Sequence, residues 1–486
     1  MNFFELKRKQ NNLPDPESPF IFFKDKTITY SEFNNKVEMV ENYFLTESIK
    51  NGEYTAILLE NNPDFITTVF ALWEIGAVPV PVNVRLNHNE IRNIIEFCDA
   101  KFLITDKMFD GKLLSPDVKI LKTPIGLSDD KQSDKKKSRY NLNDTAVIIF
   151  TSGSTGFPKG VMLSFNNLIQ SNEIGNQVLN QNSEDRWLAS LPFYHIGGFS
   201  IIMRAFLSNS SISIPPSLKT EDLISSINNQ KPTLTSFVST QLQRLLNENC
   251  HPNPELKKVL LGGGFSNEDL CRNALNKDWN IIKVYGSSEV SSFVSAVDLK
   301  IHKDKINSSG RALTSNEIKI VNDAGNILSS NKRGEIIVKS ETVMKGYLKN
   351  KTESNKKLRN GYYHTGDTGF LDDDGYLYVE ARRTDLIVSG GENINPAEVE
   401  NIIMSFGLIS DVYVFPMNDK EWGQIAVAAI VVKKNYNLTI DNLIKFLKSK
   451  LAGFKIPKKF YIVEILPRTE LGKIQKDKLI KTITKE

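Results

Sequence analysis

The chain has 486 residues, of which 40% are hydrophobic and 24% are charged, and its formal net charge is +4. This length exceeds what a single hydrophobic core serves, so we expect a globular protein of two or more domains. A charge this close to neutral argues against a nucleic-acid-binding protein, and we expect no nucleic acid as partner.

The cysteines and the apolar runs bear on the cellular location of the protein. Cys98, Cys250 and Cys271 have the spacing of neither a metal site nor a disulfide framework, which fits a reducing cytoplasm. The N-terminal residues lack an apolar stretch of signal-peptide length, and the run IAVAAIVV is too short to span a bilayer. We therefore expect a cytoplasmic protein without membrane insertion, and a homo-oligomer stays open.

Strand-like apolar runs alternate with helix-like stretches through the first two-thirds of the chain. Residues 54–60 predict a strand, NPDFITTVFALWEIGA a helix, and VPVPVN a second strand. Further along, the strand-like LKKVLLGGG at 256–264 precedes the helical SNEDLCRNALNKD and the strand-like NIIKVYG at 280–286. This alternation predicts an α/β fold with largely parallel sheets.

The pattern changes after about residue 310, where short strands separated by turns predict a small antiparallel unit. These strands are NEIKIV, GEIIVKS and the β-rich stretch GYLYVEARRTDLIVSG. The last hundred residues predict a compact α+β unit. It has helices in NPAEVENIIMSF, TIDNLIKFLKSKL and GKIQKDKLIKTI, and strands in SDVYVFPM, GQIAVAAIVV and KKFYIVEIL. We place the boundary near Arg382 to Asp385 and predict domains of residues 1–381 and 382–486.

The stretch TSGSTGFPKG at 151–160 follows the apolar, strand-like AVIIF and combines glycines, hydroxyl side chains and one lysine. Such a loop is typical of phosphate binding, because hydroxyl groups donate hydrogen bonds and glycines allow close backbone approach. Pro158 precedes Lys159 and Gly160 follows it, which differs from the P-loop order of glycine, lysine and Ser/Thr. We therefore exclude a P-loop ATPase, while a plain flexible turn stays open on these residues alone.

Further polar motifs follow in chain order. Glu289 in YGSSEV comes just after a strand, at the carboxyl end of a sheet, where α/β folds build their sites. Asp367 follows two small residues in TGD, and Lys473 lies in the turn LPRTELGKIQK. The stretch ARRTDLIVSGGENINPAEVE joins the two predicted domains.

Together these motifs resemble the adenylate-forming superfamily of acyl-CoA synthetases, peptide-synthetase adenylation domains and luciferase. The resemblance runs from TITYSEF at 27–33 to about residue 480. It implies an α/β fold with a large N-terminal domain of parallel-type sheets with helices plus a small β-rich subdomain, and a small mobile α+β C-terminal domain. It also implies that a carboxylic acid reacts with ATP to give an acyl-adenylate, from which coenzyme A then displaces AMP, with Mg²⁺ as cofactor.

The resemblance implies a role for each motif residue. The phosphates of ATP would be bound by Thr151, Ser152, Gly153, Ser154, Thr155, Gly156 and Lys159. Glu289 would ligate Mg²⁺, a hard ion that prefers carboxylate oxygen, and would act as a catalytic group. The glycine run and Tyr285 would lie at the adenine, Ser288 at the α-phosphate, and Asp367 and Arg382 at the ribose. The full set of other nucleotide-binding residues would be Gly263, Gly264, Tyr285, Gly286, Ser288, Asp367 and Arg382.

The C-terminal motifs divide between the two half-reactions. Lys473 would bridge the attacking carboxylate and the α-phosphate, because a cation between two anions reduces their repulsion. Gly390 and Gly391 in SGGENI would line the tunnel for the pantetheine arm of coenzyme A. Thr384 would be the pivot of the C-terminal domain, where relatives often carry Asp or Lys. Ala381 in place of a usual glycine also leaves the hinge detail open.

The stretch LPFYHIGGFSIIMRAF at 191–206 corresponds to the entrance of the acyl pocket. It has no acidic residue for an α-ammonium group, which disfavours amino acids, and the resemblance gives His195 a gate or pocket role in catalysis. Arg204 in an apolar helix is costly unless paired, so it predicts either a second carboxylate on the substrate or an internal salt bridge. Ser236 would add a polar atom to the pocket.

These features are most similar to family members that activate a dicarboxylic acid with an aromatic ring and a keto group. A medium-chain or aromatic acid–CoA ligase is one alternative. A carrier-protein-loading adenylation enzyme and a non-catalytic binding protein on the same fold are the others. The acidic residues and Lys473 argue against the non-catalytic protein.

Overall fold

The computed structural model describes residues 13–107, 114–123, 141–151, 158–264, 266, 268–382, 386–433, 436, 438–467 and 474–483. The chain forms two compact units. Unit 1 comprises Met1–Val84, Ile94–Phe150 and Gly160–Arg383, and unit 2 comprises Arg85–Asn93, Thr151–Lys159 and Thr384–Glu486. The predicted domain boundary between residues 381 and 382 stays a prediction.

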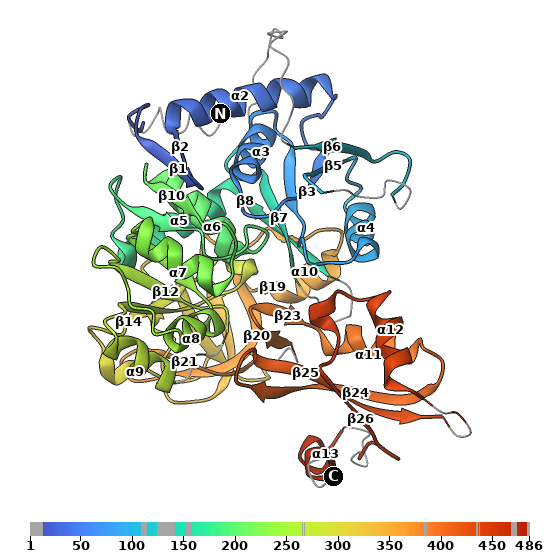
Figure 1. The fold of residues 1–486 in the computed structure, drawn as a ribbon. Helices are drawn as coiled ribbons and strands as arrows, with labels where there is room; N and C mark the ends of the chain where they lie inside the picture. The colour runs from blue at the N-terminus through green and yellow to red at the C-terminus, as the bar shows by residue number, and fades with distance from the viewer. Residues whose placement is uncertain are drawn as a thin grey trace. The chain divides into compact units, whose positions relative to one another are not determined.

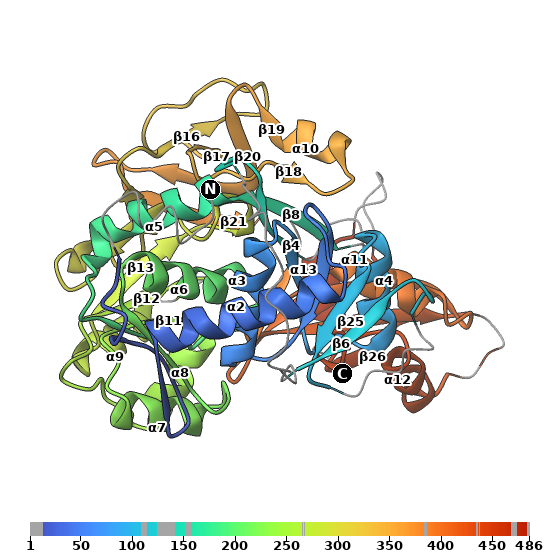
Figure 2. The same cartoon turned by 90° about the horizontal axis from the view of Figure 1, so that it is seen from above.

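The largest sheet of unit 1 has the strand order β15-β14-β13-β12-β11-β9-β10-β1-β2. The strands from β1 to β13 in this order run parallel, and β2, β14 and β15 are added antiparallel at the edges. Figure 2 shows β11, β12 and β13 next to one another. The bounds are β1 Pro19–Phe23, β2 Lys26–Thr29, β9 Arg186–Leu188, β10 Ser211–Ile214, β11 Leu234–Phe237, β12 Lys258–Leu261, β13 Ile281–Tyr285, β14 Ser295–Asp298 and β15 Arg311–Ala312.

Two smaller sheets complete the α/β part. The sheet β4-β3-β5-β6 is wholly parallel, as the alternating strands and helices predict. Its strands are β3 Tyr54–Leu58, β4 Val78–Pro81, β5 Phe102–Thr105 and β6 Lys119–Lys122. The sheet β18-β8-β7 consists of β7 Thr145–Thr151, β8 Lys159–Ser164 and β18 Gly346–Tyr347.

Helices alternate with these strands, and several begin at the signals that the sequence carries. Thr29 and Glu32 form a capping box at α2, and Asn62 caps α3, whose first residue is Pro63. The helices are α2 Tyr30–Thr46, α3 Pro63–Glu74, α4 His88–Phe97, α5 Phe165–Leu179, α6 Ile196–Leu207, α7 Thr220–Asn229, α8 Ser239–Asn247, α9 Glu268–Asn276 and α10 Lys351–Lys357, with the 3₁₀ turns η2 Ser288–Val290 and η3 Lys303–Lys305.

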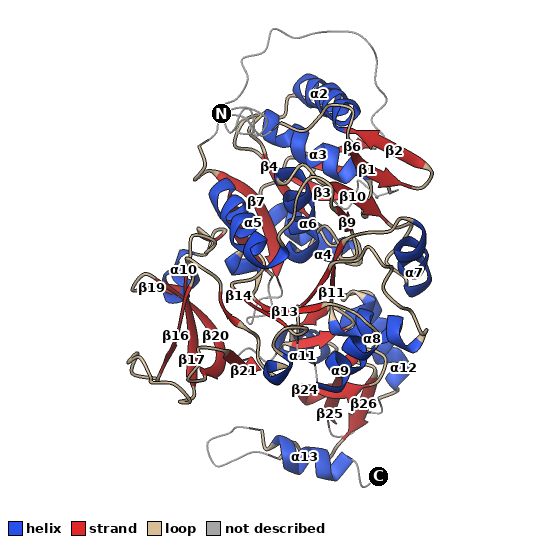
Figure 3. Ribbon diagram, turned by 90° about the vertical axis from the view of Figure 1, so that its left-hand side faces the viewer, coloured by secondary structure: helices blue, strands red, loops and turns tan. Residues whose placement is uncertain are grey.

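The antiparallel unit predicted after about residue 310 is present in unit 1. Its strand order is β16-β17-β20-β19, and β21 also pairs with β20. Figure 3 shows β16, β17 and β20 side by side. The bounds are β16 Glu317–Val321, β17 Gly334–Lys339, β19 Leu358–Arg359, β20 Tyr362–Leu371 and β21 Leu377–Arg382.

Unit 2 has the predicted α+β composition, and its C-terminal part, from β22 on, is drawn in orange to red in Figure 1. Its sheet has the order β23-β22-β25-β24, and β26 runs parallel to β25. The stretch that reads as one β-rich run, GYLYVEARRTDLIVSG, is divided here, because β21 belongs to unit 1 and β22 to unit 2. The elements are β22 Ile387–Ser389, β23 Glu392–Ile394, α11 Pro396–Met404, β24 Ile409–Asp419, β25 Gly423–Val432, α12 Ile440–Lys448, η4 Gly453–Lys455, β26 Lys459–Ile462 and α13 Lys476–Ile483.

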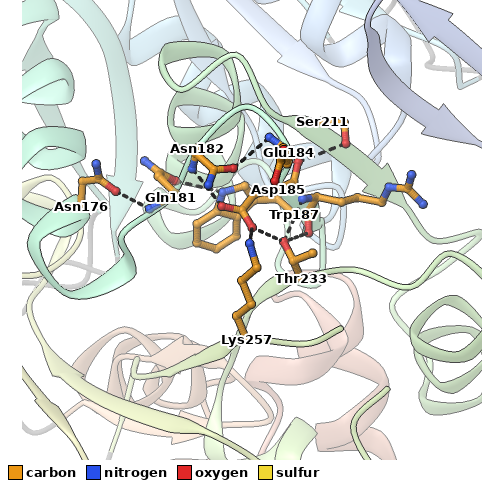
Figure 4. A network of polar contacts seen from close by, with 10 residues as sticks. Asn176, Gln181, Asn182, Glu184, Asp185, Trp187, Ser211, Thr233 and Lys257 are labelled. Carbon is orange, nitrogen blue, oxygen red and sulfur yellow. Dashed lines mark hydrogen bonds and ion pairs between the residues drawn. The ribbon is translucent and has the colours of Figure 1, made fainter. Parts of the chain in front are cut away.

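A buried polar network joins the segments around the start of β9. The Asp185 side chain is fully buried, and its Oδ1 accepts hydrogen bonds from Thr233 Oγ1 at 2.7 Å and from Lys257 Nζ at 2.8 Å (Figure 4). Its Oδ2 accepts the backbone amide of Asn182 at 2.9 Å. Because a buried carboxylate is stable only when it is paired, this network connects the loop before β9 to the segments before β11 and β12.

The described residues include no helix that is both long and apolar enough to cross a membrane.

Candidate active site

Glu289 lies in η2, directly beyond the carboxyl end of β13, as predicted. Its Oε1 accepts a 2.9 Å hydrogen bond from the hydroxyl of Tyr347, and its backbone carbonyl accepts the amide of Met344 at 2.8 Å. Burial raises the pKa of Tyr347 far above its ordinary value, and the Glu289 carboxylate raises it further. Tyr347 therefore stays protonated and keeps one oxygen of Glu289 oriented.

This geometry fits one ligand of Mg²⁺. Magnesium is usually bound through one or two carboxylates, with water and substrate phosphates completing its coordination. Among the described residues, no group of three or more His, Cys, Asp and Glu side chains is arranged to hold a metal ion. The half-buried Glu289 offers one carboxylate to such an ion.

Asp367 and Tyr285, predicted from separate motifs, are hydrogen-bonded to each other. The Tyr285 hydroxyl donates to Asp367 Oδ2 at 2.8 Å, and the Asp367 amide donates to Thr365 Oγ1 at 3.0 Å. Asp367 on β20 is also in register with Arg382 on β21. The backbone thus brings together the two residues expected at the ribose; the described part of Arg382 is its backbone.

Tyr363 is a further buried tyrosine, on β20, and was not predicted from the sequence. It is 4% exposed, and burial raises the pKa of its hydroxyl, with the charges of Glu289 and Asp367 adding to the rise. Tyr347 and Tyr285 raise this pKa in the same direction, each by more than Asp367 does. The only sequence signal for it is its position four residues before Asp367, on the same strand.

The glycines of the predicted adenine site permit close backbone approach. Gly263 has φ +77, and a Cβ on Gly262 would lie 2.7 Å from Cγ2 of Val284. At Gly286, an added Cβ would lie 2.0 Å from the backbone oxygen of Ser292. Gly263 and Gly264 are exposed at the end of β12, beside the strand that ends at Tyr285.

The predicted phosphate loop connects two neighbouring strands. Thr151 is the last residue of β7, and Lys159 is the first residue of β8. Ser152, Gly153, Ser154, Thr155 and Gly156 lie outside the described residues. Ser288, expected at the α-phosphate, begins η2 next to Glu289.

The predicted acyl-pocket residues come from α6 and β11. His195 is the N-cap residue of α6, and its ring lies 4.6 Å from that of Tyr194. Ser236 on β11 is 5% exposed, and its hydroxyl makes no hydrogen bond to a described residue. Ser287, which was not predicted from the sequence, also has a buried hydroxyl without such a bond. The signal for Ser287 was its place between Tyr285 and Glu289.

Arg204 on α6 is 1% exposed. Its Nη2 donates a 3.1 Å hydrogen bond to Ser292 Oγ, and its guanidinium lies 4.9 Å from the ring centre of Phe293 and 5.7 Å from that of Trp187. Its Nε makes no hydrogen bond within the described part of the chain. Burial lowers the pKa of Arg204 to about 9, and no described carboxylate pairs with it, so the internal salt bridge is not found there.

In unit 2, Gly390 and Gly391 form the turn between β22 and β23, with φ +58 and +87. Positive φ at both central residues is typical of a type I′ hairpin turn. A Cβ at Gly390 would lie 2.6 Å from the Trp422 ring, so a side chain is excluded there. Lys473 and Thr384 lie outside the described residues.

Comparisons with known proteins show the family to which the chain belongs. Residues 8–348 match the family model of AMP-binding enzymes, and residues 398–473 match the model of the AMP-binding enzyme C-terminal domain. Two 2-succinylbenzoate–CoA ligases, one from Bacillus cereus and one from Bacillus subtilis, are each 32% identical, over 96% of this chain and 95% of theirs.

Solved structures of o-succinylbenzoate CoA synthetase are similar to this chain as well. A double mutant of o-succinylbenzoate CoA synthetase from Bacillus subtilis, bound with its product analogue OSB-NCoA, has a TM-score of 0.93 at 31% identity, covering 99% of this chain and 98% of its own. The same enzyme in complex with ATP and magnesium ion has a TM-score of 0.75 at 31% identity and covers 98% of each chain.

Proposed function

Because this chain belongs to the family of AMP-binding enzymes, we propose that it is an ATP-dependent o-succinylbenzoate–CoA ligase, an enzyme of menaquinone synthesis. In the first half-reaction, a carboxylate oxygen of the acid attacks the α-phosphorus of ATP and pyrophosphate leaves. In the second, the sulfur of coenzyme A attacks the acyl carbon, the thiol proton is lost, and AMP leaves with the electrons of the broken C–O bond.

The observation that carries this proposal is a pair of carboxylates, each of which accepts a hydrogen bond from a tyrosine hydroxyl. Asp367 is oriented by Tyr285, and Glu289 is oriented by Tyr347. A nucleotide offers two ribose hydroxyls to the first carboxylate and phosphate-bound Mg²⁺ to the second. When bound, the ion neutralises phosphate charge and polarises the phosphoryl group. The chain itself keeps both acids aligned in advance, which lowers the cost of binding.

Arg204 and Ser236 support the choice of a dicarboxylic acid. A buried guanidinium without a described carboxylate partner is expensive, and a ligand anion would compensate it directly or through water. The buried Ser236 hydroxyl offers a further hydrogen bond near the end of β11. We assign the activated carboxylate to the nucleotide side and the second carboxylate to Arg204, with His195 at the entrance.

The remaining assignments rest on the resemblance. Thr151, Lys159 and the loop between them would hold the phosphates, and Lys473 would stabilise the charge that develops during adenylation. Gly390 and Gly391, whose turn excludes side chains, would border the path of the pantetheine arm. A mobile C-terminal domain and a cytoplasmic location belong to the same proposal, and a homo-oligomer stays open.

A panel of acids tests this function. AMP release is measured with ATP, Mg²⁺ and coenzyme A in the presence of o-succinylbenzoate, benzoate or octanoate. We expect kcat/KM for o-succinylbenzoate to exceed the other two by at least about 100-fold, because an unmatched buried charge costs several kcal/mol.

Absence of turnover with o-succinylbenzoate would overturn the assignment. Turnover of benzoate or octanoate alone would indicate an aromatic or medium-chain acid ligase. Transfer to a phosphopantetheinyl protein but not to free coenzyme A would indicate a carrier-loading enzyme.

A further inference from the structure

Lys283 is a buried cation in the centre of β13, outside the residues assigned to substrate or metal. It is 7% exposed, and its Nζ donates to the backbone carbonyls of Ile306 at 3.1 Å and Ser266 at 3.4 Å. In the described part of the chain it has no ion pair with a carboxylate. Burial lowers the pKa of this ammonium group, because a buried site disfavours a charge.

The position of Lys283 relates it to the nucleotide. On β12, its register partner is Leu261, the residue immediately before the glycine run at 262–264. On its own strand, it lies two residues before Tyr285. Lys283 is therefore next to both segments that were assigned to the adenine.

The two carbonyls that Lys283 contacts belong to segments outside the β-strands. Ser266 is 3% exposed and follows the glycine run, two residues before α9 begins at Glu268. Ile306 follows η3 and is 3% exposed. An ammonium group has three donors and can contact both carbonyls at once. Lys283 thus ties the far end of the glycine loop to a second, separate segment.

The glycine loop needs such a support. Gly263 and Gly264 are exposed and have no side chains with which to anchor the loop, and Gly263 adopts φ +77. An unsupported glycine segment loses more conformational entropy than any other when a ligand orders it. A support that orders the loop beforehand reduces that cost and strengthens binding.

We propose that Lys283 is a positioning residue for ATP, which holds the glycine loop against the strand of Tyr285 so that the adenine enters a preformed slot. This inference rests on the proposed nucleotide site and goes beyond it, because Lys283 would not touch the nucleotide. It predicts that the effect of removing Lys283 is confined to ATP, whereas a merely structural lysine would affect all substrates or only stability.

The test compares Lys283→Met, which keeps length and loses the donors, with Lys283→Gln, which keeps an amide donor. The matched control is Lys258→Met on the neighbouring β12, because Lys258 Nζ also donates to a backbone carbonyl, that of Val178 in α5. The full-length proteins are compared by calorimetric ATP binding without acid, by the KM of each substrate, and by thermal unfolding. Direct ATP binding does not depend on which acid is activated, so this result is separable from failure of the proposed substrate.

For Lys283→Met we expect ATP affinity to fall and KM for ATP to rise about two- to tenfold, the worth of one or two hydrogen bonds, while KM for the acid and for coenzyme A is unchanged. Lys283→Gln should recover part of this loss, and Lys258→Met should bind ATP like the unaltered protein. Unchanged ATP binding in Lys283→Met, or a parallel rise of all three KM values, would overturn the proposal. If Lys283→Met does not fold, Lys283→Gln must still bind ATP more weakly than Lys258→Met, and equal binding would overturn it.

Discussion

The Tyr285 hydroxyl donates a 2.8 Å hydrogen bond to Oδ2 of Asp367, which connects the carboxyl end of β13 to β20. The two residues are 82 positions apart in the chain, and each was assigned to a different part of the nucleotide. Because a hydroxyl that donates to a carboxylate fixes its orientation, Tyr285 keeps Asp367 oriented for the ribose that we propose it binds.

Asp367→Asn should therefore weaken recognition of the ribose. We expect KM for ATP to rise about 10- to 150-fold, the worth of hydrogen bonds to a charged group. The variant should also lose the preference of the unaltered enzyme for ATP over 2′-deoxyATP, measured as a ratio of kcat/KM. Tyr285→Phe, which keeps the carboxylate, should retain most of this preference. An Asp367→Asn enzyme that still rejects 2′-deoxyATP would show that the carboxylate does not bind the ribose.

Glu289 and Tyr347 give a prediction about magnesium. Glu289→Gln removes the charge that suits the ion, so we expect the Mg²⁺ concentration for half-maximal adenylation to rise about tenfold or more. Tyr347→Phe removes only the hydroxyl that orients Oε1, and it should shift the same midpoint by a smaller factor. Pyrophosphate release at increasing Mg²⁺ measures both. A loss of rate in Glu289→Gln with an unchanged Mg²⁺ midpoint would remove Glu289 from the metal site.

Features encoded by neighbouring residues could be predicted from the sequence. Tyr285 and Glu289 lie where an apolar strand gives way to small polar residues. The alternation of strands and helices similarly predicted the parallel sheets.

Partners from distant segments could not be predicted in this way. Tyr347 is 58 positions from Glu289, and Ser292 is 88 positions from Arg204, so no local pattern connects either pair. Hydrophobic periodicity also does not reveal which sheet a strand joins. This is why both strands of GYLYVEARRTDLIVSG were assigned to the antiparallel unit. The boundary predicted near Arg382 to Asp385 nevertheless lies between β21, which ends at Arg382, and β22, which begins at Ile387 in the other unit.

Lys473 should separate the two half-reactions. For Lys473→Ala we expect adenylation to fall about 100- to 1000-fold, by analogy with the loss of one preorganised charge stabiliser. Thioester formation from supplied acyl-adenylate and coenzyme A should largely survive. Lys476→Ala, three positions away, is the matched control and should leave both rates unchanged. Equal losses in both half-reactions of Lys473→Ala would contradict its role in adenylation alone.

Substitution of Asp185 should lower the stability of the protein without changing its catalytic rate. Asp185→Asn weakens three hydrogen bonds to a fully buried carboxylate, so we expect the free energy of unfolding to fall by about 1–3 kcal/mol. Lys257 is 48% exposed, and Lys257→Met should cost less than about 1 kcal/mol. Denaturant unfolding measures both, and kcat at 25 °C should match the unaltered enzyme. Equal costs for the two variants would show that the ion pair, and not the buried carboxylate, carries the network.

Arg204→Met should make the protein more stable and a worse enzyme. Replacing a buried cation that lacks a described carboxylate partner by an apolar side chain of similar length should raise the free energy of unfolding by about 1–4 kcal/mol. KM for o-succinylbenzoate should rise about tenfold or more, because the second carboxylate loses a charged partner. KM for benzoate, which has no second carboxylate, should be unchanged and serves as the control.

The dependence of stability on pH tests the role of Arg204 independently. The folded-state pKa of about 9 lies below the ordinary value of arginine, so above pH 9 the unfolded state binds more protons than the folded state. Above pH 9 the free energy of unfolding of the unaltered protein should therefore rise, and the difference between it and that of Arg204→Met should become smaller. Below pH 9 the arginine is charged in both states, so the deficit should be constant between about pH 6 and 8. The contrary outcome is an Arg204→Met protein that is less stable than the unaltered protein at pH 7 and whose KM rises equally for o-succinylbenzoate and benzoate. This would mean that Arg204 supports the fold through Ser292 and does not bind substrate.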